Sequence, residues 1–126
     1  MIKVNLENYL PEKLRYVGGE DLGYELRTKL ELNKIDSNDE QVEFIIDKKY
    51  FGANQSFFYG LLYDSSEKLT KEQLLDKYKI SSTNKDIISN FNEQVEKFYK
   101  IKELISKRWV KWIVVYLVII IILIQH

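Results

Sequence analysis

The chain has 126 residues, one proline, no cysteine and a formal net charge of zero. This length leaves room for one soluble domain of about a hundred residues and a tail. The lack of cysteine excludes a disulfide framework, a thiolate metal site and a cysteine nucleophile, and agrees with a reducing compartment. The N-terminal residues lack the apolar block of a signal peptide, so we expect the domain to stay in the cytoplasm.

The neutral total hides an uneven distribution of charge. Residues 1–96 hold 18 acidic and 13 basic residues, a net charge of −5, whereas residues 97–126 hold one acidic and six basic residues, a net charge of +5. The cations precede an apolar run, which by the positive-inside rule predicts a cytoplasmic N-terminal domain. Nucleic-acid binding by these cations is the rival interpretation, but the acidic domain would repel phosphate. The six cations are Lys97, Lys100, Lys102, Lys107, Arg108 and Lys111.

Apolar periodicity predicts the elements of the first third of the chain. Alternating side chains predict strands at residues 2–6 and 42–46. Residues 14–17 are short and mixed, and fit a strand or an ordered loop. A spacing close to 3.6 over residues 20–34, with acidic residues in the first turn, predicts a helix. Gly23 lies inside this helix and weakens the prediction.

The middle of the chain changes from turn residues to an apolar segment. Residues 47–63 fit a strand, a turn and a buried helix. Asn54 or Ser56 can cap that helix by accepting a hydrogen bond from an unpaired backbone amide. Residues 64–69 are polar and predict a loop.

Helical patterns dominate the last third. Thr70 and Gln73 form a capping box that predicts a short helix, and residues 79–83 fit another strand. From Asp86 onward an amphipathic helix continues toward the tail without a breaker, as one helix or as two that meet near Ser106. The predicted fold class is α/β (α+β): a small mixed sheet packed by helices, followed by an amphipathic helix that runs into a transmembrane helix.

The tail, residues 109–124, predicts a C-terminal membrane anchor. Val, Ile and Leu fill eleven of the twelve positions 113–124, which contributes roughly −3 to −7 kcal/mol to insertion. The apolar helix measures about 20 to 24 Å against a hydrocarbon core of about 30 Å, so a buried core helix or strand stays an alternative. Interfacial aromatics, a snorkelling lysine and the aliphatic run supply the anchor residues Trp109, Lys111, Trp112, Tyr116, Ile120 and Ile124.

Short motifs carry a family resemblance. The first is an Arg-Tyr pair, then glycine, an acidic residue, glycine and a helix rich in Glu and Arg: Arg15, Tyr16, Gly18, Gly19, Glu20, Gly23, Glu25 and Arg27. The second is a strand ending in Asp and a later Ser-Phe pair that opens a helix: Asp47, Ser56, Phe57 and Gly60. With the closing segment 69–95, residues 2–96 resemble the bacterial STAS-like domain family, relatives of anti-sigma-factor antagonists and of sulfate-transporter C-terminal domains.

The resemblance implies a regulatory protein partner, such as a kinase-like ATPase. In phosphorylated relatives an Asp-Ser pair stands at the helix start, but the matching pair here is Asn54 and Gln55, and glutamine cannot be phosphorylated. The neighbouring Ser56 has three open roles: a helix cap, a phosphosite or a partner contact. The candidate partner-contact loop comprises Gly52, Asn54, Gln55, Ser56, Phe57 and Phe58.

Other chemistry is sparse, so we predict a non-enzymatic module without a catalytic, cofactor or metal site and without a small-molecule substrate. The single histidine, His126, is the last residue, where we expect disorder or a residue left over from the preparation of the protein rather than a catalytic role. Asp36, Asp39 and Glu40 form an acidic cluster that we interpret as a solvated turn.

These observations lead to one main hypothesis. A STAS-like cytoplasmic domain (1–96), a basic juxtamembrane helix (97–108) and a single-pass anchor (109–126) would form a regulatory protein-interaction module at the bacterial inner membrane. Its expected partners are a protein and membrane lipid, and homo-oligomerisation stays open. The alternative is a membrane-perturbing effector whose tail is gated by the soluble domain.

Overall fold

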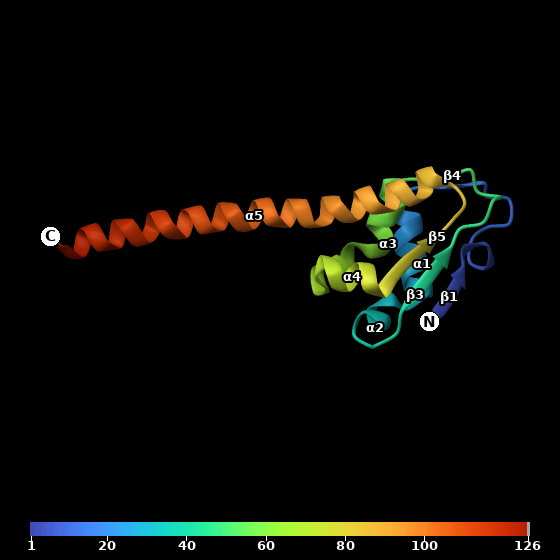
Figure 1. The fold of residues 1–126 in the computed structure, drawn as a ribbon, viewed down its shortest axis with the longest axis horizontal. Helices are drawn as coiled ribbons and strands as arrows, with labels where there is room; N and C mark the ends of the chain where they lie inside the picture. Colours follow the sequence, from blue (N-terminus) through green and yellow to red (C-terminus); the bar gives the residue numbers. More distant parts are fainter. Residues whose placement is uncertain (126) are drawn as a thin grey trace.

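The computed structural model describes residues 1–125, so the expectation for His126 lies outside the described residues. Figure 1 shows a folded domain from which one long helix projects. The elements in chain order are β1 (Ile2–Asn5), the short 3-10 helix η1 (Leu6–Asn8), β2 (Tyr16–Val17), α1 (Glu20–Lys29), α2 (Leu32–Asp36), β3 (Val42–Ile45), β4 (Gly52–Ala53), α3 (Gln55–Lys68), α4 (Lys71–Lys77), β5 (Tyr78–Ser81) and α5 (Lys85–Gln125).

The strands form a three-stranded sheet in the order β1-β3-β5 and a two-stranded sheet of β2 and β4. Val42 and Phe44 of β3 are fully buried, whereas Glu43 and Ile45 between them are partly exposed. One face of this sheet is therefore the core face, as expected for helices layered on a sheet. The predicted α+β class is confirmed.

The strand pairing differs from the expected mixed sheet, because every pair among residues 1–125 is parallel. The crossovers explain this arrangement. Helices α1 and α2 connect β1 to β3, and helices α3 and α4 connect β3 to β5. Parallel neighbours require such crossover connections.

Helices α1 and α3 cross in close contact through two glycines. A Cβ atom added to Gly23 would overlap the carbonyl oxygen of Phe57, and one added to Gly60 would overlap that of Glu20. Gly23 therefore serves the packing of two helices. Glycine is a poor helix former, so Gly23 weakens a helix prediction from sequence. A local pattern does not show the distant backbone of Phe57 that requires a glycine here.

Two predicted element boundaries are wrong. The helix predicted for residues 20–34 divides into α1 and α2 at Glu31, whose φ of 53° lies in the left-handed region. The polar loop predicted for residues 64–69 is the last part of α3 up to Lys68. Ser65 and Ser66 are buried there and make hydrogen bonds, so their polarity does not mark a loop.

Helix caps agree with the sequence prediction where the pattern is local. Asn54 is the N-cap of α3 and accepts a hydrogen bond from the backbone N–H of Phe57, at 3.0 Å. Thr70 and Gln73 form the predicted capping box of α4. Of the two candidate caps for α3, the structure selects Asn54, and Ser56 lies in the first helical turn.

Helix α5 is one continuous element of 41 residues, without a break near Ser106. Its first part belongs to the domain, because Ile87, Phe91, Val95 and Phe98 are buried in the core. The helix then leaves the domain and extends far beyond it (Figure 1). The predicted boundary between residues 96 and 97 thus falls within a helix.

Candidate functional site

The second half of α5 is an apolar helix that the domain does not cover. Trp109, Trp112, Tyr116 and Ile124 are 67%, 69%, 66% and 78% exposed, and Ile120 is partly exposed. By length and composition α5 is the one helix within residues 1–125 that can cross a membrane, and its apolar window has no burial against the domain. The alternative of a core helix would require burial that this arrangement lacks.

Basic side chains lie on α5 between the domain and this apolar half. Of these basic side chains, Lys102 contacts the domain. Its ammonium donates to the carbonyl oxygen of Ser66 and lies 5.0 Å from the ring centre of Tyr99. Lys107 forms an ion pair with Glu103 at 3.0 Å, one turn earlier on the helix. Lys111 is exposed at the start of the apolar run.

The candidate partner-contact loop is held in place by Asn54. Its Oδ1 atom accepts hydrogen bonds from the backbone N–H of Gly19 at 3.1 Å and of Phe57 at 3.0 Å. One side chain thereby joins the start of α1 to the start of α3. Gly52 lies in β4 beside the ring of Tyr16, which a Cβ atom at Gly52 would strike.

Two of the predicted loop residues do not face solvent. Phe57 and Phe58 are fully buried, and the ring of Phe58 lies 5.5 Å from that of Phe91 in an edge-to-face arrangement. A partner cannot contact these two rings in the folded domain. The prediction failed because a helix start reveals which residues are apolar but not which of them point inward.

Other residues form the exposed surface around this loop. Ser56 is exposed, and Gln55 is partly exposed, with hydrogen bonds to Glu93 at 2.6 Å and from Lys97 at 2.5 Å. Phe51, which the sequence interpretation missed, is 71% exposed and lies 5.3 Å from the ring of Tyr16. An aromatic residue directly before the turn glycine was the available signal.

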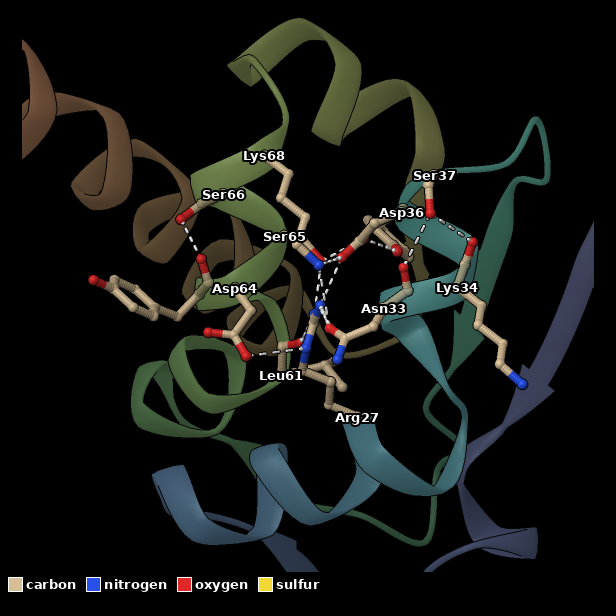
Figure 2. Close-up of polar contacts among 12 residues, drawn as sticks. Arg27, Asn33, Lys34, Asp36, Ser37, Leu61, Asp64, Ser65, Ser66 and Lys68 are labelled. Atoms are coloured by element: carbon tan, nitrogen blue, oxygen red, sulfur yellow. Dashed lines mark hydrogen bonds and ion pairs between the residues drawn. The ribbon is translucent and has the colours of Figure 1, made fainter.

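A buried polar cluster joins α1, α2, α3 and β5 in the domain (Figure 2). Arg27 donates to Asp36 at 2.6 Å, to Ser65 at 2.7 Å and to Asn33 at 2.7 Å. Ser65 also donates to Asp36 at 2.7 Å, and the Tyr78 hydroxyl donates to the same carboxylate. The Arg27 and Asp36 side chains are 3% and 0% exposed.

The polar cluster reverses the expectation for Asp36. Asp39 and Glu40 are exposed as predicted for a solvated turn, but Asp36 is buried. Burial raises the pKa of the Asp36 carboxyl, yet hydrogen bonds from Tyr78, Ser65 and Arg27, with the Arg27 charge, bring it below its ordinary value. Burial and the neighbouring Asp36 raise the pKa of Tyr78.

This arrangement fits a structural role rather than catalysis. Both carboxylate oxygens of Asp36 accept hydrogen bonds from the protein, and Arg27 also donates to the carbonyl oxygen of Leu61 at 3.0 Å. Asp64 and Lys68 extend the cluster to the surface through ion pairs of 3.6 Å with Arg27 and Asp36. A general base needs a free lone pair directed at a substrate, whereas the Asp36 carboxylate is buried and already accepts three hydrogen bonds.

Comparison with known proteins leaves the family open. No family model, no curated protein and no solved structure matches the chain. The resemblance to STAS-like domains stays an expectation. The candidate functional site is therefore defined by the geometry of α5 and of the loop before α3 alone.

Proposed function

We propose that this chain is a membrane-anchored, STAS-like protein-interaction module of the inner face of a bacterial membrane. The observation that carries the proposal is the exposed apolar half of α5. An uncovered run of this composition costs free energy in water and gains it in lipid. The domain supplies the soluble part and α5 the anchor.

The distribution of charge supports a cytoplasmic domain. The basic residues of α5 lie on the domain side of the apolar run, and residues 1–96 carry a net charge of −5. Cytoplasmic flanks of membrane helices are enriched in Lys and Arg. The rigid helix then places the domain beside the inner leaflet.

The partner-contact surface lies at the end of the domain that faces away from the apolar half of α5. In Figure 1 β4 and the start of α5 are at one end of the molecule and the C-terminal end of α5 is at the other. Phe51 directly precedes β4, Tyr16 lies in β2, which pairs with β4, and Gln55 and Ser56 begin α3. An exposed aromatic pair with a polar rim is typical of a protein interface. The resemblance implies a kinase-like ATPase as the class of partner.

Membrane fractionation tests the anchor. Two acidic residues, Leu117→Asp and Ile119→Asp, would each add about 2.5 to 3.5 kcal/mol near the centre of the helix and cancel its insertion free energy. We expect wild type in the membrane fraction after carbonate washing and the double variant in the supernatant. The matched control, Leu104→Asp with Ile105→Asp, lies on α5 before the apolar run and should stay with the membrane. Wild type in the supernatant would refute the anchor.

Affinity purification after in-cell crosslinking tests the interaction surface. Phe51→Ser removes the exposed ring directly before the candidate partner-contact loop, and we expect it to lower recovery of the partner about tenfold or more, as for a central aromatic contact. Tyr24→Ser is the control, because this exposed tyrosine lies on α1. Equal recovery with both variants would place the interface elsewhere.

A membrane-potential dye separates the anchor from the effector alternative. Overproduction of a simple tether leaves the potential and growth unchanged. Depolarisation that disappears with the Leu117→Asp and Ile119→Asp variant would favour the effector.

A further inference from the structure

Five cations of α5 lie on one side of the helix. Lys97, Lys100, Lys107 and Lys111 are spaced by three, seven and four residues, and such spacings share a helix face. Arg108 follows Lys107 directly and lies at the edge of this face. We call Lys100, Lys107, Arg108 and Lys111 the basic ridge; all four side chains are exposed.

The protein leaves most of the basic ridge without a counter-charge. Glu103 is the one acidic residue of positions 97–126, and it pairs with Lys107 at 3.0 Å. Within residues 1–125, Lys100, Arg108 and Lys111 form no ion pair with an acidic side chain. A row of unneutralised cations that the fold does not use indicates an anionic partner outside the protein.

The position of the basic ridge relative to the membrane surface identifies that partner. Arg108 and Lys111 interleave with Trp109 and Trp112, and Arg108 lines a shallow hollow together with both indole rings and Ile105. Indole rings beside an apolar run lie at the level of the lipid headgroups. The cations at the same level therefore face headgroup phosphates.

We infer that the basic ridge of α5 binds anionic lipid headgroups, an inference that rests on the proposed membrane anchor. The Arg108 guanidinium matches a phosphate with two parallel hydrogen bonds, and the lysines add point charges. Lipids with a net negative charge are enriched around this helix over zwitterionic lipids. The acidic domain, with its net charge of −5, is repelled by the same surface and stays at the end of the helix.

Tryptophan quenching measures this preference, because Trp109 and Trp112 are the two tryptophans of the chain. The full-length protein is reconstituted into vesicles of phosphatidylcholine and phosphatidylglycerol, with bromine atoms on the acyl chains of one lipid or the other. The two quenching curves yield the relative association constant of phosphatidylglycerol over phosphatidylcholine. Each cation near an anionic surface strengthens binding by about fivefold, so we expect this constant to be about five or more.

Charge variants assign the preference to the ridge. Lys100→Gln, Arg108→Gln and Lys111→Gln together should bring the relative association constant to about one, while brominated phosphatidylcholine still quenches. The control carries the same change in charge at exposed lysines of the domain and helix start, in the variants Lys13→Gln, Lys48→Gln and Lys85→Gln, and should behave as wild type.

The outcomes separate the two proposals. Equal quenching by the two brominated lipids in wild type would overturn the lipid preference and leave the anchor intact. Quenching by neither lipid would place both tryptophans outside the bilayer and overturn the anchor itself. A preference that survives the ridge substitutions would also overturn the inference. High salt should weaken the preference, since it screens exposed charges.

Discussion

Removing the charge of Asp36 tests the role of the buried cluster in folding. In Asp36→Asn one carboxylate oxygen is replaced by an NH2 group. That donor can face the guanidinium of Arg27, which in wild type donates to Asp36 at 2.6 Å. Loss of one partner of a buried ion pair leaves an uncompensated charge and costs about 3 to 5 kcal/mol. We expect the free energy of unfolding to fall by about 3 kcal/mol and the melting temperature by more than about 10 °C.

Urea unfolding of the full-length protein in non-ionic detergent, followed by far-UV circular dichroism, measures this loss. Asp39→Asn is the matched control, because Asp39 is exposed three residues away, and it should change stability by less than about 0.5 kcal/mol. An unchanged midpoint for Asp36→Asn would show that the cluster contributes nothing to folding.

The pH dependence provides a second check on Asp36. Its pKa is lower in the folded protein than the ordinary 3.8, so the folded state is stabilised above about pH 4 and loses this contribution as pH falls through the folded pKa. The stability difference between wild type and Asp36→Asn should therefore shrink below about pH 4. A difference that is the same at pH 7 and pH 3 would refute the reasoning.

Further substitutions test single contacts with the same urea titration. Gly60→Ala forces a methyl group against the backbone of Glu20, and we expect a loss of about 1 to 3 kcal/mol; no loss would mean that α1 and α3 can separate freely. Asn54→Ala removes a cap that accepts two hydrogen bonds and should cost about 1 to 2 kcal/mol, with Asn54→Asp much milder; equal losses would contradict capping. Tyr50→Phe removes a buried hydroxyl without a hydrogen-bond partner in residues 1–125, so stability should stay the same or rise by up to about 1 kcal/mol, and a clear loss would reveal a partner for that hydroxyl.

Local patterns predicted most elements of the fold. The strand at β3 follows from alternation, and the start of α4 follows from the capping box of Thr70 and Gln73. The helical character of α5 follows from an apolar spacing without a breaker, whereas the choice between one helix and two that meet near Ser106 came from the structure. Each of these signals depends on neighbours within a few residues, and such neighbours are visible in a sequence.

Contacts between distant segments could not be predicted from these local patterns. Phe57 and Phe58 were included in the candidate partner-contact loop because they follow a turn, but both are buried, and Phe58 packs against Phe91 of α5. Residues 64–69 were predicted to form a loop because they are polar, but Ser65 is buried in α3 and donates a hydrogen bond to Asp36 of α2. The pattern of polarity along one segment does not show which polar groups find partners across the fold.

The sequence by itself determined the composition of the apolar half of α5, the cations before it and most of the strands and helices, because these depend on local spacing and charge. Only the tertiary structure decided that Asp36 is a buried ion pair with Arg27 and that Gly23 and Gly60 bring two helices into contact. It also decided that Phe51, directly before the candidate partner-contact loop, is exposed, whereas Phe57 and Phe58 are buried. Each of these features depends on contacts between separate elements, and whether a side chain is buried or exposed is a property of the packed fold.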